Sequence, residues 1–502
     1  MPEVTGARAG ALVLEGGRLP GAPEAVDVLL DGGRVIELVP DGAPLTGAAA
    51  ARAERIALGG RWIVPGLYDR HVHLSQWAMV SRRLDLATAS SAAAAATLVA
   101  GEIGRGAGEI AGFGYRDGLW PDAPSLELLD AAAGDVPVVL VSADLHACWL
   151  NSAAARRHAV SPGTDGVLRE DECFRLVREL DDIADTVLDQ WVAEAATRAA
   201  ARGVVGVVDY EMRWNRDDWA RRAAGGAFPL RVAFGVYPQH LDRAIDEGLR
   251  TGEPVPGTGG LVTVGGAKAI TDGSLNTRTA WCFDPYPGLE GHAHPAGLAT
   301  VTYDELVPLM RRAHDGGLTP AVHAIGDRAN ARVLDAFEAV GCRGSIEHAQ
   351  LLRHGDVARF ARLGIVASVQ PEHAMDDRDV ADRYWRGRTD RAFMLAELAA
   401  AGVELALGSD APVAPLDPWV AIAAAVGRSR DGRAPWHPEQ AIDVRVALAA
   451  STGGAGAEVR VGGSADLTVV ELDPFTATID ELRGMPVAAT FVGGRSTHSS
   501  LG

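Results

Sequence analysis

The stretch PGLYDRHVH, from Pro65 to His73, is a short apolar segment that ends in two histidines. Side chains two residues apart on a β-strand point to the same face, so a strand over Leu67–His73 directs His71 and His73 at one spot. Two imidazoles that face one point are a typical beginning of a metal site. Surface and core histidines produce the same pair by chance, so the pattern indicates a metal only if other parts of the chain supply further ligands.

Beyond this stretch, short apolar runs alternate with alanine-rich helical segments as far as about Ser409. Such alternation is typical of parallel strands joined by helices. Eight runs have the length and composition of strands: Leu67–His73, Val204–Tyr210, Leu230–Tyr237, Val264–Ile270, Leu318–His323, Gly344–Glu347, Ile365–Gln370 and Val403–Leu407. Eight βα units predict an α/β fold built on a (β/α)8 TIM-like barrel, which we place at residues 65–414.

The interval between the first two runs is far too long for a single helix. We therefore expect residues 75–200 to form an α/β subdomain that is inserted after the first barrel strand. Both ends of the chain contain short strand-like runs next to Gly-Gly pairs, which is typical of hairpins. Neither end can bury both faces of a sheet alone, so we expect residues 1–64 and 415–502 to form one small β-sandwich with C-terminal helices.

The composition excludes several classes of protein. The 502 residues carry a net charge of −19, which argues against nucleic acid and anionic membranes as partners because their phosphates would be repelled. We see no apolar stretch of membrane-spanning length, no secretion signal and no disulfide framework among four cysteines. These features predict a soluble cytoplasmic protein that acts on a small molecule, and a homodimer is compatible with them.

Almost all of the basic residues are arginine. Of 47 basic residues, Lys268 is the one lysine and the rest are arginine. Arginine keeps its charge in proteins, whereas a buried lysine can become a neutral, reactive amine. Because Lys268 lies near the end of the predicted strand Val264–Ile270, it indicates a functional role that arginine cannot fill.

Three further polar residues stand at the ends of predicted strands, where barrel active sites lie. They are His323, His348 and Asp410. Each of them alone is a weak signal, because a single buried histidine is more often structural. Their order along the chain, together with Lys268 and the histidine pair, predicts one metal-dependent active site. Asp69 shares a face with His71, and we expect it to orient one of the ligands.

These motifs resemble the amidohydrolase superfamily, and more narrowly amidohydrolase family 3, which includes N-substituted formamide deformylases. The resemblance extends over nearly the whole chain. The matching segments are Pro65–His73, Asp144–Ser152, Lys268–Ala280, His323–Ala329, Ile346–Leu351, Ser368–His373 and Gly408–Val413. The motifs are specific for this branch but not for a substrate.

The resemblance implies a centre with two divalent metal ions per chain. In this interpretation His71, His73 and Asp410 hold the first ion, while His323 and His348 hold the second. Lys268, carboxylated by carbon dioxide, would bridge both. Zinc is the metal we favour, although imidazole and carboxylate ligands also suit manganese or iron.

The resemblance also implies a reaction. We expect hydrolysis of an amide, formamide or carbamate-like C–N bond by a metal-activated hydroxide, with Asp410 as the acid–base. Weaker candidates for contacts with the substrate are His146, Arg278 and His373.

Two other functions remain compatible with the sequence. The first is a one-metal deaminase of a heterocycle on the same barrel, which would not need a bridging lysine. The second is a non-catalytic barrel that acts as an assembly or binding protein. Such descendants usually lose metal ligands, whereas every ligand position is filled in this chain.

Overall fold

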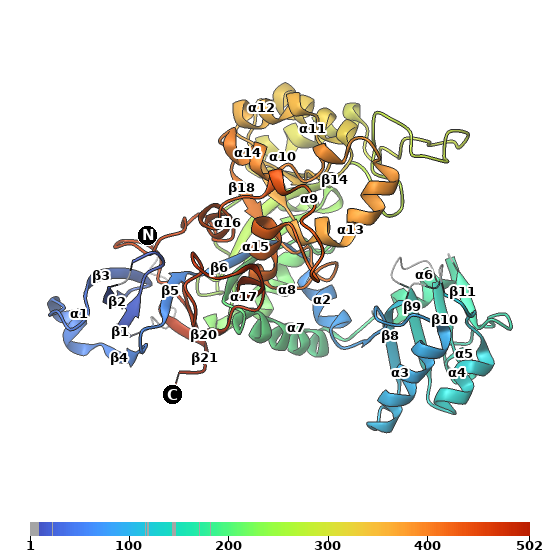
Figure 1. The fold of residues 1–502 in the computed structure, drawn as a ribbon, viewed down its shortest axis with the longest axis horizontal. Coiled ribbons are helices and arrows are strands. Elements are labelled where there is room, and N and C mark those ends of the chain that lie inside the picture. The colour runs from blue at the N-terminus through green and yellow to red at the C-terminus, as the bar shows by residue number, and fades with distance from the viewer. Residues whose placement is uncertain are drawn as a thin grey trace. The chain divides into compact units, whose positions relative to one another are not determined.

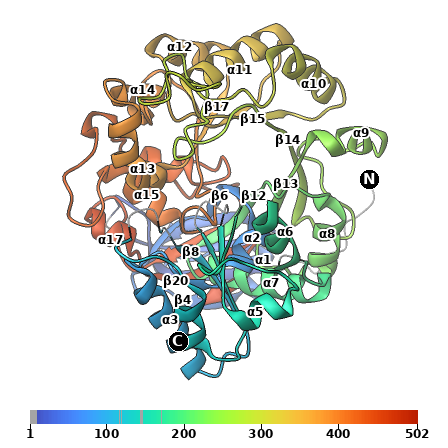
Figure 2. The same cartoon turned by 90° about the vertical axis from the view of Figure 1, so that its right-hand side faces the viewer.

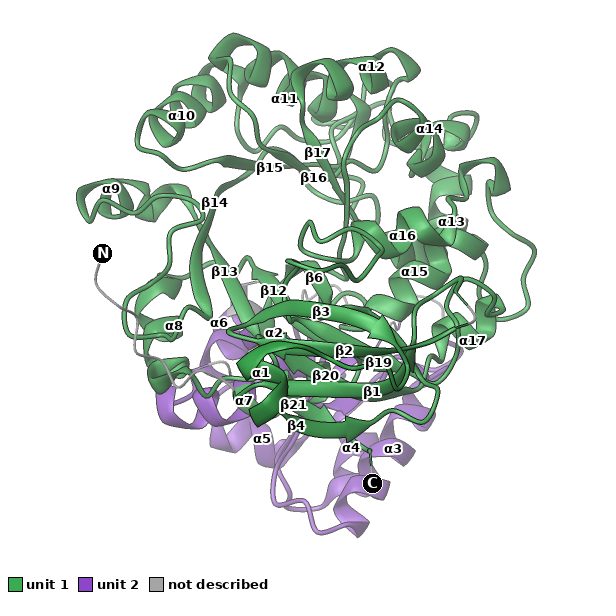
Figure 3. Ribbon diagram, turned by 90° about the vertical axis from the view of Figure 1, so that its left-hand side faces the viewer, with its two compact units in different colours: residues 1–74, 193–502 green, residues 75–192 purple. Residues whose placement is uncertain are grey.

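The structure is a computed structural model that describes residues 10–22, 24–115, 117, 120–142, 147–169, 171–180 and 182–501. The chain divides into two compact units, one of residues 1–74 and 193–502 and the other of residues 75–192 (Figure 3). The domain boundaries expected from the sequence stay a prediction.

The eight strands expected for the barrel are all present in the larger unit. They form one parallel sheet in the order β18-β17-β16-β15-β14-β13-β12-β6. Their bounds are β6 Leu67–Val72, β12 Val204–Asp209, β13 Arg231–Val236, β14 Val262–Ile270, β15 Pro320–Ala324, β16 Ser345–His348, β17 Val366–Val369 and β18 Leu405–Leu407.

The two edges of this sheet meet beyond the ends of β6 and β18. The backbone N–H of Asp410 donates to the carbonyl of His71 at 2.7 Å, and that of His73 donates to the carbonyl of Ala411 at 2.8 Å. Gly408 permits this approach, because a Cβ there would lie 2.7 Å from the backbone nitrogen of His71. The sheet is thus a nearly closed barrel, which confirms the predicted fold.

Helices follow the strands and cover the barrel, and Figure 2 shows α10, α11 and α12 outside β15 and β17. Helix α11 illustrates the cause: Val333, Leu334 and Phe337 recur at helical spacing and are fully buried. Left-handed Gly341 ends this helix. The helices of the larger unit are α8 Asn215–Arg222, α9 Pro238–Asp246, α10 Tyr303–Asp315, α11 Asp327–Val340, α12 His354–Leu363, α13 Pro371–Tyr384, α14 Leu395–Ala400, α15 Pro418–Gly427, α16 Val444–Ala450, α17 Ile479–Arg483 and, in the terminal region, α1 Gly47–Arg52.

Both termini contribute to a second sheet, whose strands lie together in Figure 3. The N-terminal strands are β1 Leu12–Arg18, β2 Ala25–Asp31, β3 Arg34–Pro40, β4 Glu54–Ala57 and β5 Trp62–Pro65, and the C-terminal strands are β19 Leu467–Val470, β20 Val487–Val492 and β21 Arg495–Ser499. Strand β19 pairs antiparallel with β5. Leu14, Val28, Leu467 and Phe491 share one buried core. Both termini therefore build one small β-structure, as predicted, and its strands belong to a single sheet.

The smaller unit has an α/β fold of its own, as the sequence predicts for the insertion. Its sheet has the order β11-β10-β9-β8-β7, and the central β9 is Val138–Ser142. The other elements are β7 Leu84–Asp85, β8 Ile110–Tyr115, β10 Ala147–Leu150, β11 Val167–Arg169, α3 Ala92–Gly104, α4 Leu126–Ala133, α5 Ser152–Arg157 and α6 Asp171–Leu180. Helices α2 Leu74–Val80 and α7 Asp185–Ala200 stand at its boundaries (Figure 1).

Across the described residues, no helix combines the length and the apolar character that a bilayer crossing demands.

Candidate metal centre

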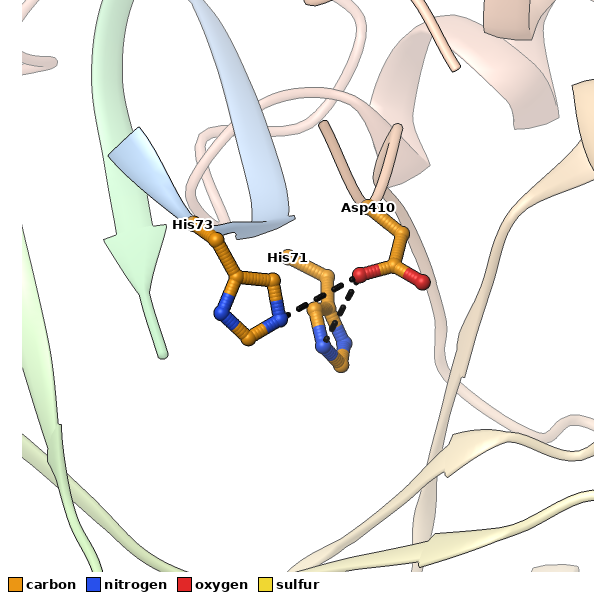
Figure 4. A group of neighbouring side chains, drawn as sticks. All are labelled: His71, His73 and Asp410. Carbon is orange, nitrogen blue, oxygen red and sulfur yellow. Dashed lines mark ion pairs between the residues drawn. The ribbon is translucent and has the colours of Figure 1, made fainter. Parts of the chain in front are cut away.

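His71 and His73 lie at the end of β6 and turn toward one carboxylate, that of Asp410 (Figure 4). The Nε2 atom of His71 lies 3.6 Å from Asp410 Oδ1, and that of His73 lies 3.4 Å from the same oxygen. Asp410 has a left-handed backbone, with φ of 57°. Two imidazole nitrogens and a carboxylate oxygen that converge in this way fit a divalent ion such as zinc.

A buried carboxylate fixes the tautomer of His71. Nδ1–H of His71 donates to Glu347 Oε2 at 2.8 Å, and both side chains are 1% exposed. Burial opposes ionisation of Glu347, yet the bond from His71 and the charge of Lys268 lower its pKa to about 2. Burial, followed by Lys268, lowers the pKa of His71 to about 4. His71 is therefore neutral near pH 7 and presents the Nε2 lone pair toward Asp410, which is the form that binds a metal.

Lys268 is buried beside this pair. Its Nζ lies 3.4 Å from His71 Nε2 and 4.3 Å from the centre of the Tyr210 ring. Burial lowers the pKa of Lys268 to about 8, although Glu347 and Asp410 act in the opposite direction. A substantial fraction of neutral amine near neutral pH is the condition for a reaction with carbon dioxide.

His348 lies at the end of another barrel strand, β16. Its ring centre lies 4.8 Å from that of His71 and 4.4 Å from that of His323. Nδ1–H of His348 donates to Gln370 Oε1 at 2.8 Å, which leaves Nε2 as the acceptor. Burial, followed by the charge of His323, holds the pKa of His348 well below its usual range.

Among the described residues, two groups have donor atoms close enough to share one ion. One group is His71, His73 and Asp410, and the other is His348, His373 and Asp410. Within each group the donor atoms lie within 4.8 Å of one another. Asp410 belongs to both groups, so the two arrangements meet at one carboxylate.

His323 lies beside His348 but contacts different groups. Its Nε2 is 3.3 Å from Asp272 Oδ1 and 3.5 Å from the carbonyl of Gly273, both in the loop after β14. The structure therefore gathers all six predicted metal ligands at one end of the barrel, with His323 at the edge of the cluster.

The weaker candidates have different positions. The guanidinium of Arg278 lies 5.4 Å from the centre of the Tyr384 ring, whereas His373 belongs to the second group of donor atoms, with His348 and Asp410. His146 is outside the described residues. Asp69 is buried, and its carboxylate accepts the backbone N–H groups of His71 and Ser409 at 3.2 and 2.9 Å. It therefore holds the backbone of the site rather than an imidazole ring.

Sequence reasoning missed Glu347, Gln370 and Tyr210. Glu347 precedes His348 directly, and neighbouring residues on an ideal strand point to opposite faces. His348 leaves the extended conformation with φ of 76°, which allows both side chains to enter the site. An acidic residue directly beside a histidine at a strand end was the available signal.

Comparison with known proteins identifies the family of this chain. The family model described as the amidohydrolase family matches residues 54–498. The chain belongs to the amidohydrolase family and, as the motifs indicate, to its family 3 branch. It is a metal-dependent hydrolase, an enzyme that acts on carbon–nitrogen bonds, and this membership sets aside the non-catalytic barrel.

Two curated relatives and one solved structure show how far the similarity extends. The putative amidohydrolase YtcJ of Bacillus subtilis is 29% identical and covers 89% of this chain and 90% of its own. The N-substituted formamide deformylase of Arthrobacter pascens is 28% identical and covers 95% of both chains. An uncharacterized metal-dependent hydrolase from Pyrococcus horikoshii has the same fold, with a TM-score of 0.78, 24% identity and coverage of 94% of this chain and 99% of its own.

Proposed function

We propose that this enzyme hydrolyses the C–N bond of an amide, formamide or carbamate-like small molecule at a centre of two divalent ions, with zinc as the favoured metal. The observation that carries the proposal is the convergence of the His71 and His73 Nε2 atoms on Asp410. The formamide deformylase similarity over 95% of the chain supports this class of substrate. We place the enzyme in the cytoplasm.

We assign the ligands as the family pattern suggests. His71, His73 and Asp410 would hold one ion, and His323 and His348 would hold the other. Carboxylated Lys268 would bridge them, and its burial 3.4 Å from His71 Nε2 supports this role. A pair of divalent ions supplies Lewis acidity to a carbonyl oxygen and makes water a nucleophile near neutral pH.

The side chains around the ions would transfer the proton and hold the ligands in place. Asp410 is ionised, because the neighbouring His71 and a hydrogen bond from His73 overcome burial and hold its pKa well below the usual range. It can accept the proton of the attacking water and deliver that proton to the leaving nitrogen. Glu347 keeps His71 in one tautomer throughout. Burial of Lys268 next to His71 favours this two-ion arrangement over a one-metal deaminase.

The bridging role of Lys268 is testable by substitution. We expect Lys268→Ala and Lys268→Arg to lose most activity while the protein still folds, because neither side chain can carry a carbamate. Bicarbonate with a short-chain carboxylic acid should partly restore Lys268→Ala, since a free carboxylate can occupy the position of the carbamate. Hydrolysis rates and melting curves of both variants measure these effects.

Arg332→Ala provides the matched control for a lost positive charge. Arg332 is half exposed on α11, where it pairs with Asp335 at 3.0 Å, and we expect wild-type activity. Full activity of Lys268→Arg would rule out the carbamate bridge.

A further inference from the structure

Two cysteines of the smaller unit lie side by side in its core. The Sγ atom of Cys148 on β10 is 2.8 Å from the Sγ atom of Cys173 on α6. Both side chains are fully buried, and both residues are thiols in the structure. They are 25 residues apart in the sequence, a separation that carries no pairing signal of its own. The fold alone therefore brings the two sulfur atoms together.

The local structure explains this contact. Cys148 and Leu150 alternate along β10 and so point to one face of the sheet, whereas Cys173 and Leu176 lie three residues apart on one face of α6. All four side chains belong to one small apolar core. Strand β11 pairs with β10, with Leu168 opposite Cys148, and precedes α6 in the chain. The chain thus folds back after β11 and packs the helix against this face of the sheet.

Helix α6 depends on its contact with the sheet. It has ten residues, DECFRLVREL, of which half are charged, and an isolated helix of this length is marginal in water. Cys173 and Leu176 are buried in the shared core, and Val177 and Leu180 pack partly buried against it. We therefore expect α6 to separate from the sheet more easily than the whole unit unfolds. A covalent bond at Cys173 would fix the helix within this contact.

The surroundings of the two thiols determine how they react. The hydrogen bond with Cys173, followed by burial, raises the pKa of Cys148. The thiolate is the form that attacks a disulfide, and it needs access to its target. A small-molecule disulfide therefore reacts when α6 opens and both sulfur atoms meet water. When the helix closes again, the second sulfur returns to the first.

We propose that Cys148 and Cys173 form a disulfide bond when the enzyme meets a small-molecule disulfide, and that this bond fastens α6 to β10. The thiolate of one cysteine attacks a sulfur of the small molecule, forms a mixed disulfide and releases one thiol. The thiolate of the other cysteine then attacks the protein sulfur and releases the second thiol. The two cysteines lose two electrons, and their protons pass to the two released thiols. The proposal is independent of the metal centre.

Peptide mapping of the whole chain tests the pairing. We would incubate the protein with oxidised glutathione, block the remaining thiols with iodoacetamide and analyse the non-reduced peptides by mass spectrometry. We expect a Cys148–Cys173 bond in the wild type and no bond within the protein in Cys148→Ser. Cys342→Ser is the matched control, because it also removes one of the four cysteines but from the larger unit, and it should keep the bond. Cys173→Ala repeats the test if Cys148→Ser fails to fold.

Limited proteolysis tests whether the bond fastens the helix. Trypsin cleaves after arginine, and Arg175 and Arg178 are exposed on α6. Since cleavage follows the opening of a segment, we expect oxidation to slow cleavage at these sites at least about tenfold and dithiothreitol to restore the rate. The oxidant should not change this rate in Cys148→Ser.

Two results would overturn the proposal. The first is a wild type in which Cys148 and Cys173 stay thiols, keep a bound glutathione or pair with other cysteines after oxidation. The second is a Cys148–Cys173 bond that leaves tryptic cleavage of α6 at the rate of the reduced protein, which would show that the bond does not restrain the helix.

Discussion

Asp410 is the residue at which the two groups of donor atoms meet. Its carboxylate faces His71 and His73, and the same side chain lies within reach of His348 and His373. Its φ of 57° places it in the left-handed region, which is uncommon for a residue other than glycine and clusters at functional sites. The backbone is therefore arranged to present this one carboxylate.

Substitution of Asp410 separates proton transfer from metal binding. Asp410→Asn keeps the shape and an oxygen donor but cannot carry a proton. We expect the variant to retain much of its metal, while turnover falls by at least about 10²–10⁴, the range for such proton transfers. Metal analysis and steady-state kinetics on the same preparation measure both. Normal metal content with an undiminished rate would show that another group is the acid–base.

For single residues, the sequence predicted the site histidines that lie at the ends of strands. It missed the residues whose place in the site depends on strand pairing or on an irregular backbone. His71 and His73 follow from simple alternation along β6. Gln370 is a partner of His348 only because β16 and β17 lie side by side. Glu347 enters the site because His348 leaves the extended conformation, and residue spacing does not contain that information.

At the scale of elements, β19 determines how the two ends of the chain depend on each other. It pairs with β5 on one side and with β20 on the other. Its Leu467 and Val469 are buried in the core of the terminal sheet. Loss of the C-terminal strands would expose both an edge of β5 and this apolar face.

We therefore expect deletion of residues 464–502 to yield insoluble protein. Phe491→Ala should lower the free energy of unfolding by about 3–5 kcal/mol, because the ring is fully buried. Ser496→Ala on β21, where the side chain is exposed, should leave stability nearly unchanged. Solubility and thermal melting measure these effects, and a soluble truncation with wild-type melting would contradict the shared core.

The elements differ in how well the sequence predicts them. Barrel strands such as Val204–Asp209 are buried apolar runs between polar helices, so their positions were predicted to within a few residues. Strand β21, RSTHS, is polar and mostly half exposed, and β7 has two residues. Neither strand has the apolar pattern that signals a strand in a sequence. Each is recognised only by its pairing with a neighbouring strand.

At the scale of the whole molecule, the barrel brings together ligands that are far apart in the sequence. His71 and Asp410 are separated by most of the barrel, and the contact between β6 and the loop after β18 unites them. Only closure of the sheet achieves this, and the sequence predicted closure from the number of βα units. The loops at the mouth of the barrel select the substrate, and their conformations do not follow from the number of βα units. The sequence therefore predicts the reaction class but not the substrate.

The most direct test of a metal-dependent C–N hydrolase is the rate of amine release from N-substituted formamides, N-acyl amines and carbamates before and after removal of metal. We predict that the zinc-loaded protein hydrolyses at least one of these classes. Chelation should abolish the activity, and added zinc should restore it, because the side chains alone provide no Lewis acid. Hydrolysis at an undiminished rate by metal-free protein, or no amine release by the zinc-loaded protein from any class, would contradict the account.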